Sequence, residues 1–173
     1  MGQCRHVFLA LDLTEEVLEQ AIKAGADMIL THHPMIFSGV KKINNHTSLG
    51  RRLLTLIENQ IPYYAMHTNY DIFGMADCSA SRLGLTDTKV LSVTEEEGGR
   101  VAGFGRVGKL PCPMTLAQCA RHVKESNGLS DVRLYGNPLA QVEIAAVCTG
   151  SGKSMIEDAI KAGAQVYITG DID

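Results

Sequence analysis

Two short runs of polar residues carry the groups in this sequence that are best suited to metal chemistry. His32 and His33 come directly after one short apolar segment, and His67 and Asp71 follow a second one. Imidazole nitrogens and carboxylate oxygens are common ligands of divalent metal ions. If the two apolar segments are neighbouring parallel strands, their carboxyl ends open onto a shared crevice, where these side chains would meet. The sequence therefore predicts one metal site built from three histidines and an aspartate.

The adjacency of His32 and His33 constrains how such a site is arranged. Successive side chains on extended backbone point to opposite sides, so the two imidazoles cannot easily face one small ion together. Either they serve two ions, which in hydrolytic sites lie about 3.5 to 4 Å apart, or only one of them binds. The simpler alternative is that histidines at strand ends only hydrogen-bond to a loop. The clustering of three histidines with one carboxylate favours metal binding.

The elements that must hold these residues follow a β-α-β pattern. Thr14 is a suitable helix N-cap, because its hydroxyl can accept a backbone N–H of the first turn. The acidic residues Glu15 and Glu16 follow it and favour the positive end of a helix. Gly25 is suited to end that helix. We also expect strands at residues 7–11, 27–31 and 61–66, a loop at 34–45 and an amphipathic helix at 48–59. The second and third strands would then release the two histidine runs at their carboxyl ends.

The rest of the chain completes this first α/β half and begins a second one. We expect helices at 75–83, 116–126 and 155–162, strands at 88–93, 101–107, 132–135, 142–147 and 166–169, and a solvated acidic turn at 95–99. The run at residues 21–26 recurs letter for letter at 159–164, each time before an apolar segment that ends in threonine. The repeat predicts an α/β fold of duplicated halves with mostly parallel strands, at residues 1–95 and 96–173.

The register of this repeat gives Asp171 two interpretations. His32 and His33 correspond in it to Gly170 and Asp171. Asp171 would then be a further metal-facing or metal-supporting carboxylate at an equivalent strand end. A Gly-Asp pair after a strand also commonly opens a helix, so a helix cap is the other interpretation.

Two glycine-rich runs share letters with nucleotide-binding motifs but do not meet their requirements. Residues 103–108 spell a dinucleotide fingerprint, yet Pro111 and Pro113 follow too soon for the helix that it needs. We expect a strand there, in which small residues permit close packing. Residues 150–154 end like a phosphate loop, but Val147 stands where the first glycine belongs. An anion contact at the free backbone N–H groups of that run stays a minor alternative.

The composition excludes several classes of protein. The chain has 173 residues, 45% of them hydrophobic, which is enough for a substantial core. Its net charge of -3, from 16 basic and 19 acidic residues, does not favour nucleic acid or an anionic membrane as a direct ligand. No apolar run nears the roughly 20 residues that span a bilayer, and no secretory signal begins the chain. We expect a soluble cytoplasmic protein, whose five cysteines are small buried thiols outside any disulfide framework.

Five runs, taken together, resemble the Nif-three-like family, whose members are labelled GTP cyclohydrolase type 2 homologues. They lie at residues 11–14, 31–34, 67–71, 150–152 and 169–172. The resemblance covers nearly the whole chain, and the double histidine combined with the His-Thr-Asn run is its most specific part. It implies a duplicated α/β fold with a dinuclear centre of divalent metal ions (zinc, iron, manganese or magnesium), often in a hexameric ring built as a trimer of dimers.

The resemblance also assigns roles to residues. By the family pattern His32, His33 and Asp71 are metal ligands, with His67 beside them. His67 would then support the ligands or carry protons in catalysis, because imidazole exchanges protons near neutral pH.

Other features of the family pattern do not occur in this sequence. Family members generally begin with a further segment that carries an Asp-Asn-Val-Gly-like run, and they continue to a His-x-x-x-Glu pair that completes the metal site. We therefore expect this chain to be part of a longer protein. The charge of the ligand runs supports this expectation. Asp71 is the one anion in the two runs, whereas two divalent ions bring four positive charges. Water or hydroxide, Asp171, Asp173 or further residues must supply the rest.

Three functions compete on this sequence. The first is a metal-dependent hydrolase, in which the metal pair activates a bridging water that attacks a small-molecule substrate. The family label implies that this substrate is GTP. For a nucleotide base, Tyr70 and Phe73 are candidate stacking partners, since the chain has no Trp and few aromatic residues. The second is a protein-interaction scaffold whose metal ions are structural. The third, a nucleic-acid binder, is disfavoured by the charge balance.

Overall fold

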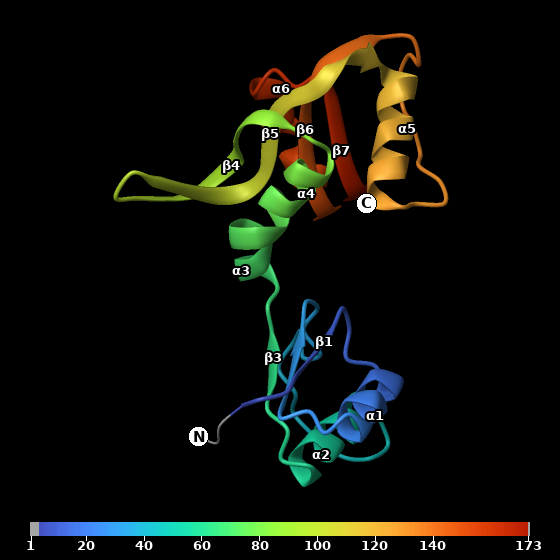
Figure 1. Ribbon diagram of the computed structural model, residues 1–173. Helices are drawn as coiled ribbons and strands as arrows, with labels where there is room; N and C mark the ends of the chain where they lie inside the picture. The colour runs from blue at the N-terminus through green and yellow to red at the C-terminus, as the bar shows by residue number, and fades with distance from the viewer. Residues whose placement is uncertain (1–3, 173) are drawn as a thin grey trace. The chain divides into compact units, whose positions relative to one another are not determined.

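The computed structural model describes residues 4–172, apart from the side chains of Glu97 and Arg100. The chain forms two compact units, Met1–Tyr70 and Asp71–Asp173 (Figure 1), and each is described by itself. The division that we expect at residues 95 and 96 concerns the sequence duplication and stays a prediction.

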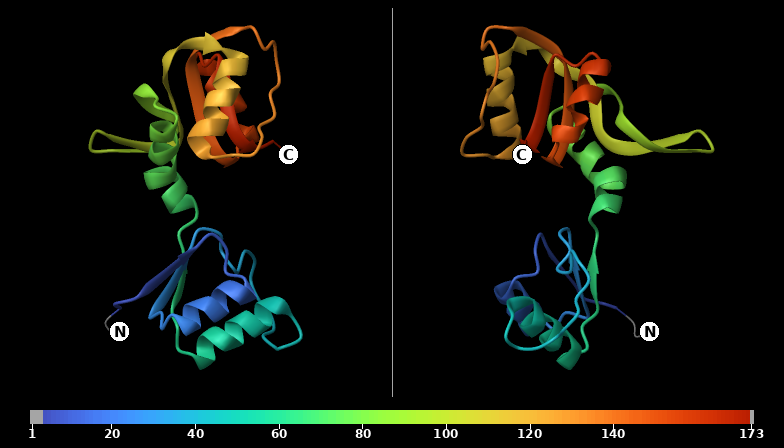
Figure 2. Two further views of the ribbon diagram at one scale, coloured as in Figure 1. Left: turned by 45° about the vertical axis from the view of Figure 1, so that its right-hand side comes forward. Right: turned by 180° about the vertical axis from the view of Figure 1, so that it is seen from behind.

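The first unit is a three-stranded parallel sheet with two helices. Its elements are β1 (Val7–Ala10), α1 (Glu15–Lys23), β2 (Met28–Thr31), α2 (Ser48–Glu58) and β3 (Tyr63–Ala65), followed by the single turn α3 (Thr68–Tyr70). The strand order is β1-β2-β3, and both pairs are parallel, as the sequence predicts. The two longer helices lie side by side against one face of the sheet (Figure 2). Leu13, Leu18, Ala21, Ile29 and Leu56 form the buried core beneath them.

The helix ends in this unit follow the local sequence. The Thr14 hydroxyl accepts the backbone N–H of Val17 at 3.1 Å, which confirms Thr14 as the N-cap of α1. Gly25, just past the helix, has a φ of 64°, a conformation that costs glycine little. Gly163 holds the same position after the repeated run, with a φ of 75°. The two runs therefore end equivalent helices, each before a strand.

The second unit is built on a four-stranded sheet. It begins with the π-helix η1 (Asp71–Met75) and α4 (Ala76–Arg82), and continues through β4 (Thr86–Glu97), β5 (Arg100–Thr115), α5 (Leu116–Asn127), β6 (Gln141–Ser151), the 3-10 turn η2 (Lys153–Met155), α6 (Ile156–Lys161) and β7 (Val166–Asp171). The order is β4-β5-β6-β7, with β6 and β7 parallel and the other two pairs antiparallel. This sheet is mixed, so the expectation of mostly parallel strands holds for the first unit alone.

Three local expectations in the second unit are wrong. Residues 132–135 form no strand, because their backbone pairs with no strand, although Val132 and Leu134 are half-buried and alternate with exposed residues. The residues Glu95–Glu97 belong to β4, and the turn is the pair Gly98 and Gly99, both at positive φ as a tight hairpin requires. The strand expected at 101–107 is longer, because β5 runs on to Thr115. Pro111 and Pro113 fit within it, at the register shift where pairing with β6 lapses and no N–H is needed.

The cysteines correct a further expectation. All five are free, but only Cys119 and Cys148 are buried, whereas Cys4, Cys78 and Cys112 are exposed.

Within residues 4–172, no helix combines the length and the apolar character that a membrane crossing needs.

Candidate metal centre

His32 leaves the carboxyl end of β2 with its imidazole in a defined tautomer. Its Nδ1 lies 2.9 Å from the carbonyl oxygen of Met66, at the end of β3. A carbonyl can only accept, so Nδ1 donates to it, and Nε2 is the ring nitrogen that would bind a metal ion. Backbone carbonyls orient metal-binding histidines in the same way. His32 is therefore prepared as an Nε2 ligand by a contact that joins two neighbouring strand ends.

The backbone around His33 is fixed by two hydroxyl groups that the sequence analysis missed. Thr31, with 1% of its surface exposed, donates its hydroxyl to the His33 carbonyl at 2.8 Å. The Tyr63 hydroxyl donates to the same oxygen at 3.1 Å and accepts the N–H of Met35 at 2.8 Å. This network locks the turn that releases both histidines. The signal in the sequence was a hydroxyl residue at the end of an apolar strand, directly before the histidines.

His67 and Asp71 are brought together by a helical turn rather than by a loop. His67 precedes α3, its carbonyl accepts the N–H of Tyr70 at 2.9 Å, and Asp71 opens the π-helix that follows. Residues four apart on a helical turn lie on one side of it, which aligns the imidazole with the carboxylate. π-helical turns are rare and often occur at functional sites. The sequence predicts that these residues meet, but its pattern does not indicate the helix that joins them.

Three of the four predicted residues form a group that could hold a metal ion. His32, His67 and Asp71 each offer one ligand atom, and these atoms all lie within 4.8 Å of one another. Two imidazoles and one carboxylate are a known donor set for zinc and for non-haem iron. Tyr70 packs edge-on against His32, with ring centroids 6.3 Å apart. His67 thus stands among the potential ligands, where the family pattern places it only beside them.

His33 does not belong to that group, although its ring is close to it. The His33 ring centroid lies 5.0 Å from that of His32 and 6.1 Å from that of His67. Its Nδ1 lies 2.8 Å from Oδ1 of Asp12. The two neighbouring histidines therefore have different partners, as we expect for successive side chains on extended backbone.

The other acidic candidates are Asp171 and Asp173, at the end of the second unit. Asp171 ends β7, where its carboxylate accepts the N–H of Ile172 at 2.8 Å, and both of its interpretations stay predictions. Asp173 lies outside the described residues. Burial raises the pKa of the Cys148 thiol, and the charge of Asp71 raises it further, so this thiol stays protonated at neutral pH. We assign Cys148 to the core.

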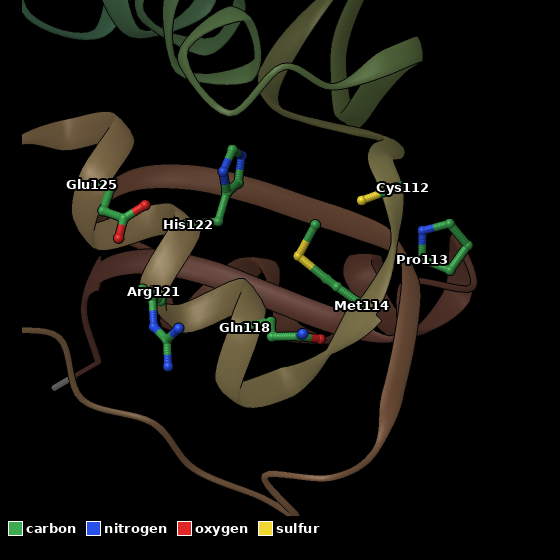
Figure 3. Close-up of a pocket in the computed structure, with 7 residues that line it drawn as sticks. All are labelled: Cys112, Pro113, Met114, Gln118, Arg121, His122 and Glu125. Carbon is green, nitrogen blue, oxygen red and sulfur yellow. The ribbon is translucent and has the colours of Figure 1, made fainter.

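A shallow pocket in the second unit offers no comparable chemistry. It lies between the end of β5 and α5, and it is lined by Cys112, Pro113, Met114, Gln118, Arg121, His122 and Glu125 (Figure 3). His122 is held there as a structural residue, because its Nε2 donates to the carbonyl of Leu83 at 2.9 Å. Among residues 4–172, the histidine–aspartate group remains the one cluster of three or more potential metal ligands.

Replacing Tyr63 by Phe is expected to loosen the histidine turn. The change removes one hydroxyl that serves both the His33 carbonyl and the Met35 N–H. Thr31 still donates to the His33 carbonyl in this variant, but the Met35 N–H loses its acceptor. A donor left unpaired in a partly buried network costs about 1 to 3 kcal/mol in the free energy of unfolding. Urea denaturation measures the loss. Tyr64→Phe is the matched control, and a loss in this control as large as in Tyr63→Phe would contradict the assignment.

Comparison with known proteins places the chain in a family. Residues 2–173 match the family model described as Duf34/NIF3 (NGG1p interacting factor 3). A Clostridium perfringens protein named GTP cyclohydrolase 1 type 2 homolog is 37% identical over 167 residues, which are 95% of this chain and 63% of that protein. A Schizosaccharomyces pombe protein named Protein NIF3 homolog is 32% identical over 175 residues, covering 96% of this chain and 62% of that one.

Solved structures agree with the family match. The crystal structure of a Bacillus cereus protein related to NIF3 superposes with a TM-score of 0.91 at 28% identity, over 98% of this chain and 73% of the other. A Staphylococcus aureus protein superposes with a TM-score of 0.88 at 26% identity, over 99% of this chain and 68% of the other. The resemblance inferred from the sequence is confirmed. The chain spans slightly less than two thirds of the length of the Clostridium perfringens relative.

Proposed function

We propose, because the chain belongs to the Duf34/NIF3 family, that it carries the metal-binding part of a metal-dependent hydrolase similar to GTP cyclohydrolase type 2. The observation that supports this most is the group of His32, His67 and Asp71, whose ligand atoms lie within 4.8 Å of one another. The orientation of His32 adds support, since its Nδ1 donates to the carbonyl of Met66, as the outer nitrogen of a metal-binding histidine commonly does.

The proposed centre holds two divalent ions, with zinc, iron, manganese and magnesium as candidates. One ion would take His32 and Asp71, and His33 with its free Nε2 would serve the second. Bound divalent ions lower the pKa of a coordinated water and make it a nucleophile at neutral pH. His67 acts in this proposal as a third ligand or as the group that accepts the proton of the attacking water.

A nucleotide is the substrate class that we propose. Tyr70 and Phe73 flank the Asp71 carboxylate in sequence and keep 38% and 66% of their surfaces exposed. Exposed aromatic rings beside a cationic centre suit a molecule with a flat base and an anionic phosphate group. We also propose a homo-oligomer, in keeping with the hexameric ring that the resemblance implies, and no nucleic acid or membrane as a partner.

A scaffold without turnover is the alternative. The family description itself refers to an interacting factor, and the chain spans 63% of the length of its Clostridium perfringens relative. In this alternative the same residues bind structural metal ions, and the functional surface is a protein interface.

Metal reconstitution tests the hydrolase proposal. The chain and the longer Clostridium perfringens relative are stripped with a chelator, reloaded with each candidate ion, and assayed for metal content and for GTP ring opening. We expect metal-dependent loss of GTP in at least one loading. Metal binding without turnover of GTP or phosphate esters by either protein would favour the scaffold. The His67→Ala variant separates its two roles: lost metal indicates a ligand, and retained metal with lost turnover indicates proton transfer.

A further inference from the structure

Almost every polar atom of His33 is engaged. Its backbone N–H donates to the carbonyl of Leu11 at 3.0 Å, and its carbonyl accepts the hydroxyls of Thr31 and Tyr63. Its ring Nδ1 is 2.8 Å from a carboxylate oxygen of Asp12. Within residues 4–172, only Nε2 is left without a hydrogen-bond partner. A residue held at three points with one free nitrogen is prepared for a ligand at that nitrogen.

The contact between Asp12 and His33 follows from the register of the sheet. Ala10 of β1 pairs with Thr31 of β2, and these are the last paired residues of the two parallel strands. Asp12 and His33 each lie two residues further on. The Leu11 carbonyl, which accepts the His33 N–H, continues the ladder past the strand ends. The carboxylate therefore reaches the imidazole because the two strands end level with each other.

Stability does not explain this contact. The Asp12 and His33 side chains keep 55% and 47% of their surfaces exposed, and exposed ion pairs contribute little to the free energy of folding. What the contact does determine is the tautomer. An ionised carboxylate can only accept, so in the neutral imidazole Nδ1 carries the proton and Nε2 keeps its lone pair.

We propose that Asp12 is a positioning residue, which holds His33 in the Nδ1–H tautomer so that Nε2 is available to a divalent cation beside the His32, His67 and Asp71 group. Carboxylates behind metal-binding histidines act in this way, and they also raise the basicity of the ligand nitrogen. The role in cation binding rests on the proposed metal centre. The effect on the tautomer does not, because it is a property of the metal-free protein.

The first measurement is the tautomer in the metal-free chain. Nitrogen-15 spectra of the histidine rings, with His33 assigned from the His33→Gln variant, are expected to show protonated Nδ1 in the natural sequence. In Asp12→Ala the His33 signals shift toward the Nε2–H form, and in Asp12→Asn, whose amide oxygen can still accept, they shift less. Unchanged His33 signals in Asp12→Ala would overturn the proposal.

The second measurement is cation affinity, determined by competition between the chain and a chromophoric chelator for Zn²⁺ and Mn²⁺. Loss of a partner behind a metal ligand typically costs about 10- to 100-fold in affinity. We expect a loss of this size in Asp12→Ala, a smaller one in Asp12→Asn, and none in Glu19→Ala, which removes an exposed acidic residue from α1.

The two measurements fail in different ways. Altered His33 signals with unchanged affinity in Asp12→Ala would overturn the role of Asp12 in cation binding. If the natural sequence binds no cation, the proposed metal centre fails, and the ring spectra still decide whether Asp12 sets the tautomer. An equal affinity loss in Glu19→Ala would reduce the effect of Asp12 to general electrostatics.

Discussion

Replacing Asp71 by Ala is expected to lower the affinity of the chain for divalent ions by more than about 100-fold. Asp71 is the one carboxylate in the group with His32 and His67. Hard divalent ions require negative charge near them, and neutral imidazole cannot supply it. Loss of a group behind a ligand already costs about 10- to 100-fold, so loss of a charged ligand should cost more. Elemental analysis and chelator competition on purified protein measure the change.

Two histidines outside the group provide the controls for Asp71. His46 lies in the exposed loop before α2, and His122 donates to the Leu83 carbonyl in the second unit. Both His46→Ala and His122→Ala should keep their metal content. Circular dichroism of Asp71→Ala checks that the π-helix and α4 remain folded. Full metal content in a folded Asp71→Ala protein would remove Asp71 from the ligand set.

The positions of the ligand residues were predictable because they depend on strand order and chain direction. Short apolar segments, the Thr14 cap and the helix-ending Gly25 indicated parallel strands with helical crossovers, and the structure has them. In such a sheet, residues after the carboxyl ends of adjacent strands lie at one edge. That rule brings His32 to Met66 and its neighbour His67 without any knowledge of side-chain contacts.

The finer features of the site depend on contacts that periodicity does not encode. The π-helix at Asp71 and the hydroxyls of Thr31 and Tyr63 contribute through particular hydrogen bonds. Asp12 could have been found, since it follows its strand at the same offset as His33 follows the next one. The mixed second sheet escaped prediction because a duplicated helix end says nothing of the strands that precede it.

The glycine run at residues 103–108 shows how a motif is decided by its context. The run lies within β5, as expected, and no helix follows it directly. An added Cβ at Gly103 would lie 2.0 Å from the Ser92 carbonyl oxygen of β4, and one at Gly108 would lie 2.7 Å from that of Thr86. The glycines therefore let two strands approach closely. Arg106 of the same run is buried, and it donates to the carbonyls of Gly103 and Gly105 and pairs with Asp77 of α4.

Replacing Gly103 by Ala is accordingly expected to destabilise the second unit by about 3 kcal/mol or more, at the upper end of what overpacking costs. The clash is with backbone, which cannot rotate away as a side chain could, so β4 and β5 must separate. For a chain of this size the loss corresponds to a fall of about 6 to 12 °C in the unfolding temperature. Calorimetry measures the fall, and amide hydrogen exchange should locate it in the β4–β5 pair.

Gly39→Ala is the matched control for this prediction. An added Cβ at Gly39 meets no atom within 4 Å, and its φ is not in the left-handed region, so the same substitution should change the unfolding temperature little. The dinucleotide interpretation of the run predicts instead that the natural sequence binds NAD and that Gly103→Ala abolishes this binding. If the Gly103→Ala variant has the same unfolding temperature as the natural sequence, close strand packing does not explain the glycines. If the unfolding temperature falls strongly in Gly103→Ala but not in Gly39→Ala, and the natural sequence binds no NAD, the run is assigned to the packing of the sheet.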